Sequence, residues 1–201
     1  FADKNALVVI TSYSGGTEEA LGCYTEARRR KLSVFVITTG GTLARRADKD
    51  QVARYIFDPR YNPSRQPRLG LGYGVASLLM LLADIKASSI TGKKIISLCK
   101  SIKYEASDRE VNFVRGRSVI IVASEHLIGV AHALSNQMNE TAKTFAPYFT
   151  LPELNHHLME GLVSIKNPNK EWSALFLSSD KYFSRVTKRY TLTERIFQKQ
   201  K

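Results

Sequence analysis

The segment from Ala6 to Thr17, with the sequence ALVVITSYSGGT, constrains the fold of this chain more than any other. Residues 7–10 form an unbroken apolar run rich in β-branched side chains, which is typical of a short strand buried on both faces of a parallel sheet. A turn rich in hydroxyls and glycines follows, and a helical pattern opens at Thr17. Free backbone N–H groups and the positive end of the helix dipole meet at such a turn. The segment therefore predicts a βα unit with an anion site at its turn.

Three hydroxyl side chains are the candidate ligands of this anion: Ser12, Ser14 and Thr17. Gly15 and Gly16 would let the backbone approach the anion closely. A simpler alternative is that Thr17 only caps the helix, because two acids follow it in the first turn. A cap does not call for two serines and two glycines, so the pattern favours the anion site.

The rest of the first hundred residues predicts a second βα unit and a long connection. Residues 32–37 (LSVFVI) read as a strand, and the turn at 38–42 is open between a functional role and an ordinary strand-to-helix turn. Residues 48–68 hold three prolines, which predicts a loop or an extended connection. An apolar helix is expected over 75–85.

The second half repeats this organisation without obvious sequence identity. A polar segment over 86–112 predicts a linker or a helix pair, and 117–124 (RSVIIVAS) predicts another buried strand. A helix over 126–138, a strand at 174–178 and a basic helix from Leu192 complete the pattern. Strands that alternate with crossover helices predict an α/β protein, an αβα sandwich with parallel sheets flanked by helices. We expect two domains, residues 1–100 and 101–201.

Composition excludes several classes of protein. The net charge is +12, but the basic residues occur in short groups without interleaved aromatic residues, so we expect no nucleic-acid partner. The charge suits steering of phosphorylated metabolites equally well. No apolar run is long enough for a membrane span, so no membrane partner is expected. Cys23 and Cys99 lack metal or redox spacing, which favours a reduced, cytoplasmic location.

Four motifs together resemble a known family. SYSGGTEE at 12–19 resembles the SYSGNTEE signature of sugar isomerase (SIS) domains, with Gly16 in place of the usual Asn. NETAK at 139–143 and PELNHH at 152–157 are similar to NENAK and PELNHN of the bifunctional phosphoglucose/phosphomannose isomerases. A Pro-Arg pair, Pro67 and Arg68, resembles the pair that opens the last helix of the first SIS domain in that family. The resemblance implies that the two expected domains are SIS domains.

The resemblance also implies roles. Ser12, Ser14 and Thr17 would hold the sugar phosphate, and Glu140 would transfer the proton between C1 and C2. His156 would open the sugar ring, since imidazole serves as both acid and base near neutral pH. Arg68 would stabilise the charge of the enediolate, with Arg60 and Arg65 as rivals. This chemistry needs neither a metal nor a redox cofactor.

Some features depart from the family pattern. His157 stands where the family usually has Asn, and His126 and His132 lack any motif and are interpreted as structural. The glycine-rich turn of the family's first βα unit and its C-terminal lysine have no counterpart here, so we expect a chain that is incomplete at both ends.

The expected function is an aldose–ketose isomerase that interconverts glucose 6-phosphate, mannose 6-phosphate or both with fructose 6-phosphate through a cis-enediolate. The family forms a homodimer in which the histidine comes from the neighbouring subunit. The alternative is an SIS domain that binds a sugar phosphate without converting it.

Overall fold

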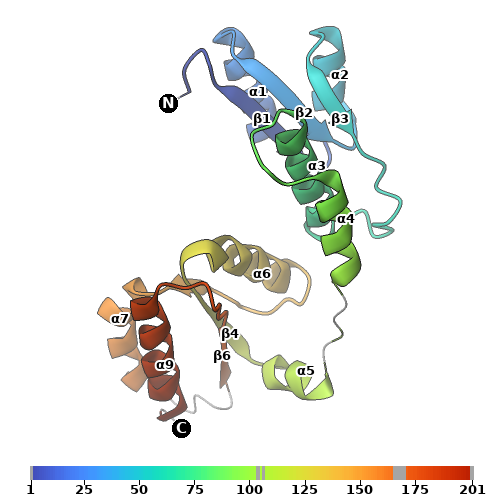
Figure 1. The fold of residues 1–201 in the computed structure, drawn as a ribbon. Helices are drawn as coiled ribbons and strands as arrows, with labels where there is room; N and C mark the ends of the chain where they lie inside the picture. Colours follow the sequence, from blue (N-terminus) through green and yellow to red (C-terminus); the bar gives the residue numbers. More distant parts are fainter. Residues whose placement is uncertain (1, 103–104, 106, 165–170, 200–201) are drawn as a thin grey trace. The chain divides into compact units, whose positions relative to one another are not determined.

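The computed structural model describes residues 2–102, 105, 107–164 and 171–199. The chain divides into two compact units, Phe1–Lys103 and Tyr104–Lys201 (Figure 1). Each unit contains a three-stranded parallel sheet with helices packed on it, which confirms the predicted α/β class. Among the described residues, none of the helices combines the length and apolar character needed to cross a membrane.

The first unit has the strand order β1-β2-β3. Its elements are β1 (Leu7–Ser12), α1 (Glu18–Arg29), β2 (Ser33–Thr38), α2 (Gly41–Lys49), β3 (Ala53–Ile56), the 3-10 turn η1 (Pro67–Leu69), α3 (Leu71–Asp84) and α4 (Gly92–Ser101). The register pairs Ser12 with Thr38 and Thr38 with Ile56. The carboxyl ends of the three strands therefore lie at one edge of the sheet.

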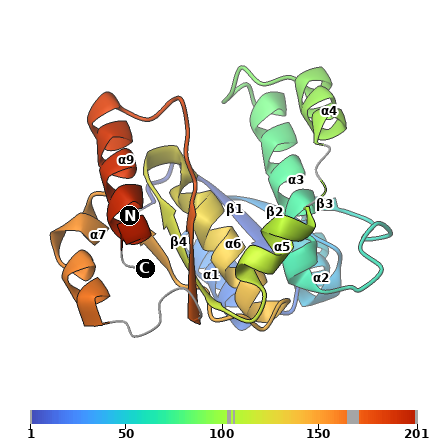
Figure 2. The ribbon, with the colours of Figure 1, turned by 90° about the horizontal axis from the view of Figure 1, so that it is seen from below.

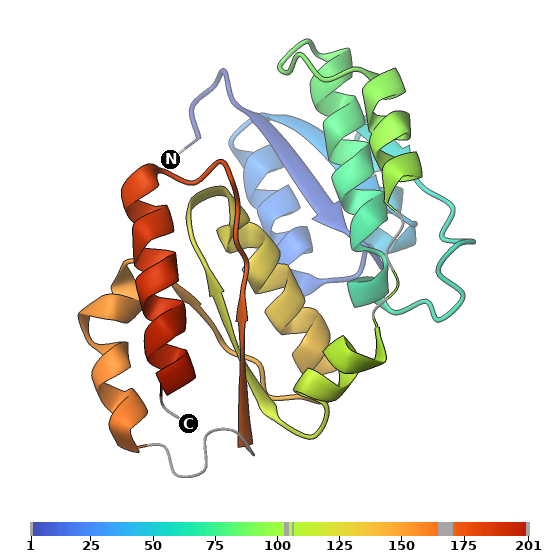
Figure 3. The same cartoon turned by 60° about the horizontal axis from the view of Figure 1, so that its bottom comes forward.

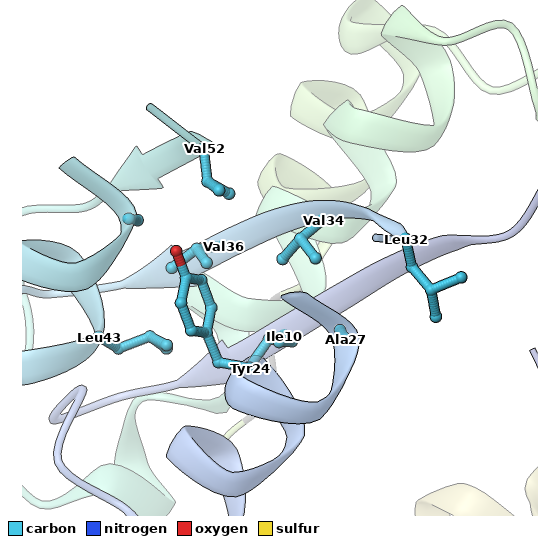
Figure 4. Packing of buried hydrophobic residues seen from close by; sticks show 9 residues of the cluster. Ile10, Tyr24, Ala27, Leu32, Val34, Val36, Leu43 and Val52 are labelled. Atoms are coloured by element: carbon cyan, nitrogen blue, oxygen red, sulfur yellow. The ribbon is translucent and has the colours of Figure 1, made fainter. Parts of the chain in front are cut away.

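The core of this unit lies between the sheet and helices α1 and α2. Ile10 and Val36 project from β1 and β2 onto Tyr24 of α1 and Leu43 of α2 (Figure 4). Helix α3 packs on the other side of the strands from α1 (Figure 3). Both faces of β2 are covered, which explains why its sequence is an almost continuous apolar run.

The prediction of an irregular connection over 48–68 is wrong at two places. Helix α2 continues to Lys49, and residues 53–56 form β3, which pairs with β2 from Phe35↔Ala53 to Thr38↔Ile56. All four residues of β3 are exposed, since β3 is an edge strand. Its sequence, ARYI, therefore carries neither the apolar run nor the alternation that marks a buried strand.

The second unit has the strand order β5-β4-β6, again parallel. Its elements are α5 (Asp108–Val114), β4 (Ser118–Ala123), the 3-10 turn η2 (Glu125–Leu127), α6 (Ile128–Glu140), β5 (Tyr148–Thr150), α7 (Glu153–His156), the 3-10 helix η3 (Leu158–Ser164), β6 (Trp172–Phe176) and α9 (Ser184–Lys199). β5 was not predicted, and α9 begins eight residues before the expected start.

The central strand of this unit is buried on both faces. Ile120 and Val122 pack against Leu154 of α7 and Tyr190 of α9, while Ile121 packs on the opposite side, in a cluster with Ala131 of α6. Figure 2 shows α6 on one side of β4 and α7 with α9 on the other. This arrangement is the αβα layering that the apolar run at 117–124 predicts.

Candidate active site

The turn between β1 and α1 holds the three predicted anion ligands at the carboxyl end of β1. Ser12 is buried, whereas Ser14 and Thr17 are exposed. The hydroxyl oxygens of Ser12 and Thr17 lie 3.0 Å apart, and Ser12 Oγ accepts a hydrogen bond from the Gly15 N–H at 3.1 Å. Thr17 is the N-cap residue of α1 by position, but its side chain makes no capping hydrogen bond. The Thr17 hydroxyl faces the turn, where it can donate to an anion at the helix N-terminus.

Glycines allow this turn to pack closely against the neighbouring turn that follows β2. Gly15 has φ +65° and Gly41 has φ +72°. A Cβ atom on Gly15 would overlap the Gly40 carbonyl and lie 2.8 Å from Thr38 Oγ1, and one on Gly41 would overlap the Ser14 carbonyl. The Leu43 N–H also donates to Gly15 O at 2.8 Å. The two turns are therefore packed backbone against backbone.

The turn at 38–42 supports its neighbour. Thr39 donates to the Tyr13 carbonyl twice, from its N–H at 3.1 Å and from its hydroxyl at 2.7 Å. The Thr38 hydroxyl donates to Gly40 O at 3.1 Å. Both hydroxyls are used inside the fold, so the geometry favours the interpretation of 38–42 as a structural turn.

Arg68 lies in η1, and η1 packs next to the turn after β1 that contains Ser12 and Ser14, which we call the serine-containing turn. Gly70, two residues after Arg68, lies so close to the Tyr13 ring that a Cβ atom on it would come 2.7 Å from Tyr13 Cδ2. The arginine side chain is half-buried and is engaged in interactions. The first unit therefore places Ser12, Thr17 and Arg68 on turns at the same edge of the sheet.

The two rival arginines have other surroundings. Arg60 is exposed, and its Nε donates to Asp58 Oδ2 at 2.7 Å, which holds the pKa of Asp58 below its usual range. Arg65 is exposed and has φ +55° within the loop that precedes η1. Of the three, Arg68 is the one that is half-buried, whereas the turn that ends at Arg65 contacts Tyr13 through Asn62.

Glu140 is the last residue of α6 and is exposed. The adjacent Asn139 holds the helix end: its Nδ2 donates to Ser135 O at 2.8 Å and to Ala146 O at 3.2 Å. Lys143 Nζ donates to Glu140 O at 2.8 Å. The NETAK motif thus fixes the backbone that presents the Glu140 carboxylate.

His156 ends α7 and is exposed, between two anchored residues and a second histidine. Leu154 is buried in the core, and Asn155 Nδ2 donates to Thr193 Oγ1 of α9 at 2.8 Å. His157 Nδ1 lies 3.6 Å from Glu153 Oε1. The motif therefore supplies anchors that orient the turn and a histidine that points outward from it.

The second unit does not bring Glu140 and His156 together. Helix α6 starts after the carboxyl end of β4 and returns to its amino end, where Val119 N donates to Phe145 O at 2.9 Å. β5 then runs parallel to β4, and His156 follows its carboxyl end. Glu140 therefore lies near the amino ends of the parallel strands, and His156 lies at their carboxyl ends.

The two remaining histidines each contact a neighbouring side chain of the second unit. His126 Nε2 lies 3.0 Å from Ser179 Oγ, with its ring 5.2 Å from that of Tyr182. The His132 ring stacks on Tyr148 at 5.2 Å.

The second unit also contains a cavity of about 310 Å³, and its lining is entirely apolar. Leu158, Met159, Trp172 and Phe197 are among the lining residues, and neither Glu140 nor His156 is one of them. Without a charged or hydroxyl group, this cavity is not suited to a sugar phosphate.

Sequence reasoning missed two residues that shape the edge of the first unit, Tyr13 and Asn62. The Asn62 side chain is buried and donates from Nδ2 to Tyr13 Oη at 2.8 Å. Tyr13 lies inside the SYSGGTEE motif, so the motif could have indicated that this side chain is near the site. Nothing in the sequence indicates a role for Asn62, because it lies 49 residues away in a proline-rich loop.

Comparison with known proteins agrees with these motifs. Residues 105–201 match the family described as the bacterial phospho-glucose isomerase C-terminal SIS domain. The chain is 28% identical over 199 residues to the bifunctional phosphoglucose/phosphomannose isomerase of Aquifex aeolicus, covering 98% of this chain and 60% of that protein. It is 32% identical over 183 residues to the protein of the same name from Caldicellulosiruptor bescii, covering 83% of this chain and 52% of that protein.

A solved structure shows the same fold. The crystal structure of tagatose-6-phosphate ketose/aldose isomerase from Escherichia coli superimposes with a TM-score of 0.55 at 14% identity, covering 96% of this chain and 66% of that one. The chain spans between about half and two thirds of the length of the curated relatives it matches.

Proposed function

We propose that the protein is an aldose–ketose isomerase of sugar phosphates, in agreement with the match of residues 105–201 to the family described as the bacterial phospho-glucose isomerase C-terminal SIS domain. It interconverts glucose 6-phosphate, mannose 6-phosphate or both with fructose 6-phosphate. The reaction moves a proton between C1 and C2 through a cis-enediolate. We place the reaction in the cytoplasm, as expected for a metabolic isomerase of this kind.

The observation that carries the proposal is the Ser12–Thr17 hydroxyl pair at the N-terminus of α1. The Thr17 side chain leaves the helix end uncapped and faces Ser12 at 3.0 Å. Hydroxyls and backbone N–H groups at such a turn suit the phosphate of a sugar, with Ser14 as a third ligand. Holding the phosphate converts remote binding energy into orientation of the sugar carbons.

The chemistry is assigned to three further side chains. Glu140 removes the proton from one carbon and returns it to the other, which a single carboxylate on one face of the enediolate can do. Arg68 stabilises the negative charge on the enediolate oxygens. His156 acts as acid and base when the sugar ring opens. No metal or redox cofactor enters these steps.

We further propose that the active site is shared in a homodimer. Glu140 and His156 lie at opposite edges of one sheet, so a site that uses both needs His156 from another subunit. An oligomer with two-fold symmetry would form two such sites.

The second candidate function is a sensor that binds a sugar phosphate without converting it. Ser12, Ser14 and Thr17 would suffice for that role, whereas binding alone does not require Glu140.

The decisive experiment is Glu140→Gln in the full-length gene product, assayed with both hexose 6-phosphates. A base that acts in the transition state contributes little to ground-state affinity, so fructose 6-phosphate should bind within about three-fold of the wild type. Isomerisation should fall by about 100-fold or more, and exchange of the C2 proton with solvent should fall in parallel. Glu160→Gln, an exposed glutamate of η3, is the matched control and should keep its activity.

Two outcomes would contradict the proposal. Turnover of Glu140→Gln near the wild-type rate would make Glu140 a structural acid. A wild-type protein that binds fructose 6-phosphate but never exchanges the C2 proton would be the sensor.

A further inference from the structure

Tyr13 connects the two turns that carry the proposed phosphate ligands and Arg68. Its backbone belongs to the turn after β1, where the Tyr13 carbonyl accepts two hydrogen bonds from Thr39. Its ring reaches across to Gly70, immediately after η1. The main chain of Tyr13 is therefore held by Thr39 in the turn that follows β2. Its ring packs against Gly70 and so limits how closely η1 can approach.

Asn62 completes this connection from the other side. Its side chain is 4% exposed, and Nδ2 donates both to Tyr13 Oη at 2.8 Å and to Gln66 O at 2.9 Å. Ser64 Oγ donates to Asn62 Oδ1 at 2.7 Å. Gln66 O in turn accepts from the Leu69 N–H at 3.0 Å, inside η1. One buried amide thus joins the Tyr13 hydroxyl to the first residue before η1.

Aromatic packing fixes the orientation of the Tyr13 ring. The Phe57 ring contacts it edge-on, with centroids 5.6 Å apart, and Phe57 stacks on Tyr73 of α3 at 4.8 Å. The Phe57 N–H donates to Thr38 O at 3.0 Å. The ring therefore has little freedom to swing away from Gly70, because Phe57, which directly follows β3, is itself held by Thr38 and by Tyr73 of α3.

The absence of a side chain at residue 70 is what permits the close approach. Gly70 has φ −98° and ψ 9°, a conformation open to other residues, so the backbone itself does not demand glycine. A Cβ atom there would come 2.7 Å from Tyr13 Cδ2 and closer still to Cε2. The reason for glycine is the contact with Tyr13.

We propose that Tyr13, Asn62 and Gly70 are positioning residues that set the distance between the serine-containing turn and Arg68. This inference rests on the proposed function, in which the first turn binds the phosphate and Arg68 acts at the other end of the sugar. A fixed distance between the two places the enediolate oxygens against the guanidinium when the phosphate is bound. Misplacement by about 1 Å can cost about 100-fold in rate.

The test compares Gly70→Ala with Gly72→Ala in the full-length protein. Gly72 lies in the first turn of α3, and a Cβ atom there meets nothing within 4 Å, so it is a matched control. Because the Tyr13 backbone is held by Thr39, the added methyl at residue 70 should displace η1 and leave the phosphate turn in place. Gly70→Ala should therefore lower kcat about ten-fold or more while the Kd of inorganic phosphate stays within about two-fold. Gly72→Ala should leave both unchanged.

A double-mutant cycle separates positioning from general destabilisation. If Gly70→Ala acts through Arg68, the same substitution in an Arg68→Ala background should lower kcat by less than about two-fold. The cycle is repeated with the calorimetric Kd of fructose 6-phosphate, which requires no turnover. Tyr13→Phe removes only the hydroxyl that Asn62 contacts, and it should lower kcat about three-fold or more with the same dependence on Arg68.

The outcomes distinguish this inference from the proposed function. Turnover in the wild type with additive effects of Gly70→Ala and Arg68→Ala would overturn the positioning role and leave the isomerase in place. Absence of turnover, with non-additive effects on the fructose 6-phosphate Kd, would overturn the isomerase and support the positioning role. Equal behaviour of Gly70→Ala and Gly72→Ala would overturn the positioning role in either case.

Discussion

The hydroxyl of Thr17 faces that of Ser12 at 3.0 Å, although Thr17 occupies the position from which a threonine usually caps a helix. This relationship predicts a ligand role that can be measured apart from helix stability. Replacing both residues by Ala should raise KM for the sugar phosphate about 100-fold, because two hydrogen bonds to a charged group are lost. Steady-state kinetics checks this, and Thr25→Ala on the exposed surface of α1 is the control. An unchanged KM in the double variant would remove the phosphate assignment.

Gly15 and Gly16 should respond differently to the same substitution. Gly15→Ala combines φ +65° with overlap of the Gly40 carbonyl, so the two turns must separate and phosphate affinity should fall about ten-fold or more. At Gly16 the nearest atom to a Cβ would be Ser14 Oγ at 3.8 Å, an ordinary contact. Gly16→Ala should therefore bind phosphate within about three-fold of the wild type, as measured by calorimetry. Similar losses in both variants would show that the glycines are needed for flexibility and not for the packing of the turns.

The adjacent histidines His156 and His157 should not be equivalent. His156→Gln should lower turnover of the cyclic sugar about 100-fold, because it removes the proposed acid and base of ring opening. His157→Gln should keep most activity, since this ring lies beside Glu153 at the surface. The reverse order of effects, measured with glucose 6-phosphate, would transfer the role to His157.

Sharing of the site between subunits predicts complementation. Mixing Glu140→Gln with His156→Gln after unfolding and refolding would form heterodimers in which one site has both native residues. Activity should then rise to about a quarter of the wild-type value, as random pairing in a two-fold dimer requires. A mixture as inactive as its components would place both residues of each site in one subunit.

Tyr24 predicts a loss of stability at alkaline pH. Burial, followed by its hydrogen bond to Asp50 at 2.9 Å, raises the pKa of Tyr24 to about 12. An unfolded tyrosine loses its proton near pH 10, so the folded chain retains a proton that the unfolded chain releases between about pH 10 and 12. Stability contributed by neutral Tyr24 is therefore present below pH 10 and is lost as the pH rises through this window.

Tyr24→Phe should flatten this decline, as thermal unfolding measured from about pH 8 to 12 would show. Part of the slope should remain, because burial also raises the pKa of Tyr190. A slope identical in wild type and Tyr24→Phe would exclude a contribution from this hydroxyl.

The sequence by itself determined the central strands and the chemistry of the motifs. Residues 33–38 and 118–123 form the central strands, and their apolar runs can be recognised without any partner because helices cover both of their faces. The run at 7–10 also forms a strand, but burial on both faces was wrong for it: β1 lies at the edge of its sheet and Leu7 is exposed. The hydroxyls and glycines of the first turn predict an anion site from neighbouring residues alone, because a helix N-terminus follows them directly in the sequence.

Only the tertiary structure determined the edge strands β3 and β5 and the contacts between turns that are distant in the sequence. β3 and β5 are short edge strands whose pairing comes from β2 and β4, so their own residues carry no clear pattern. The contact of Tyr13 with Gly70 and the bond of Tyr13 to Asn62 join residues about 50 positions apart, which no periodicity encodes. The separation of Glu140 from His156 also depends on the tertiary structure. Helix α6 crosses back from the carboxyl end of β4 to its amino end, where Glu140 lies, and the parallel strand β5 then returns the chain to the carboxyl end, where His156 lies.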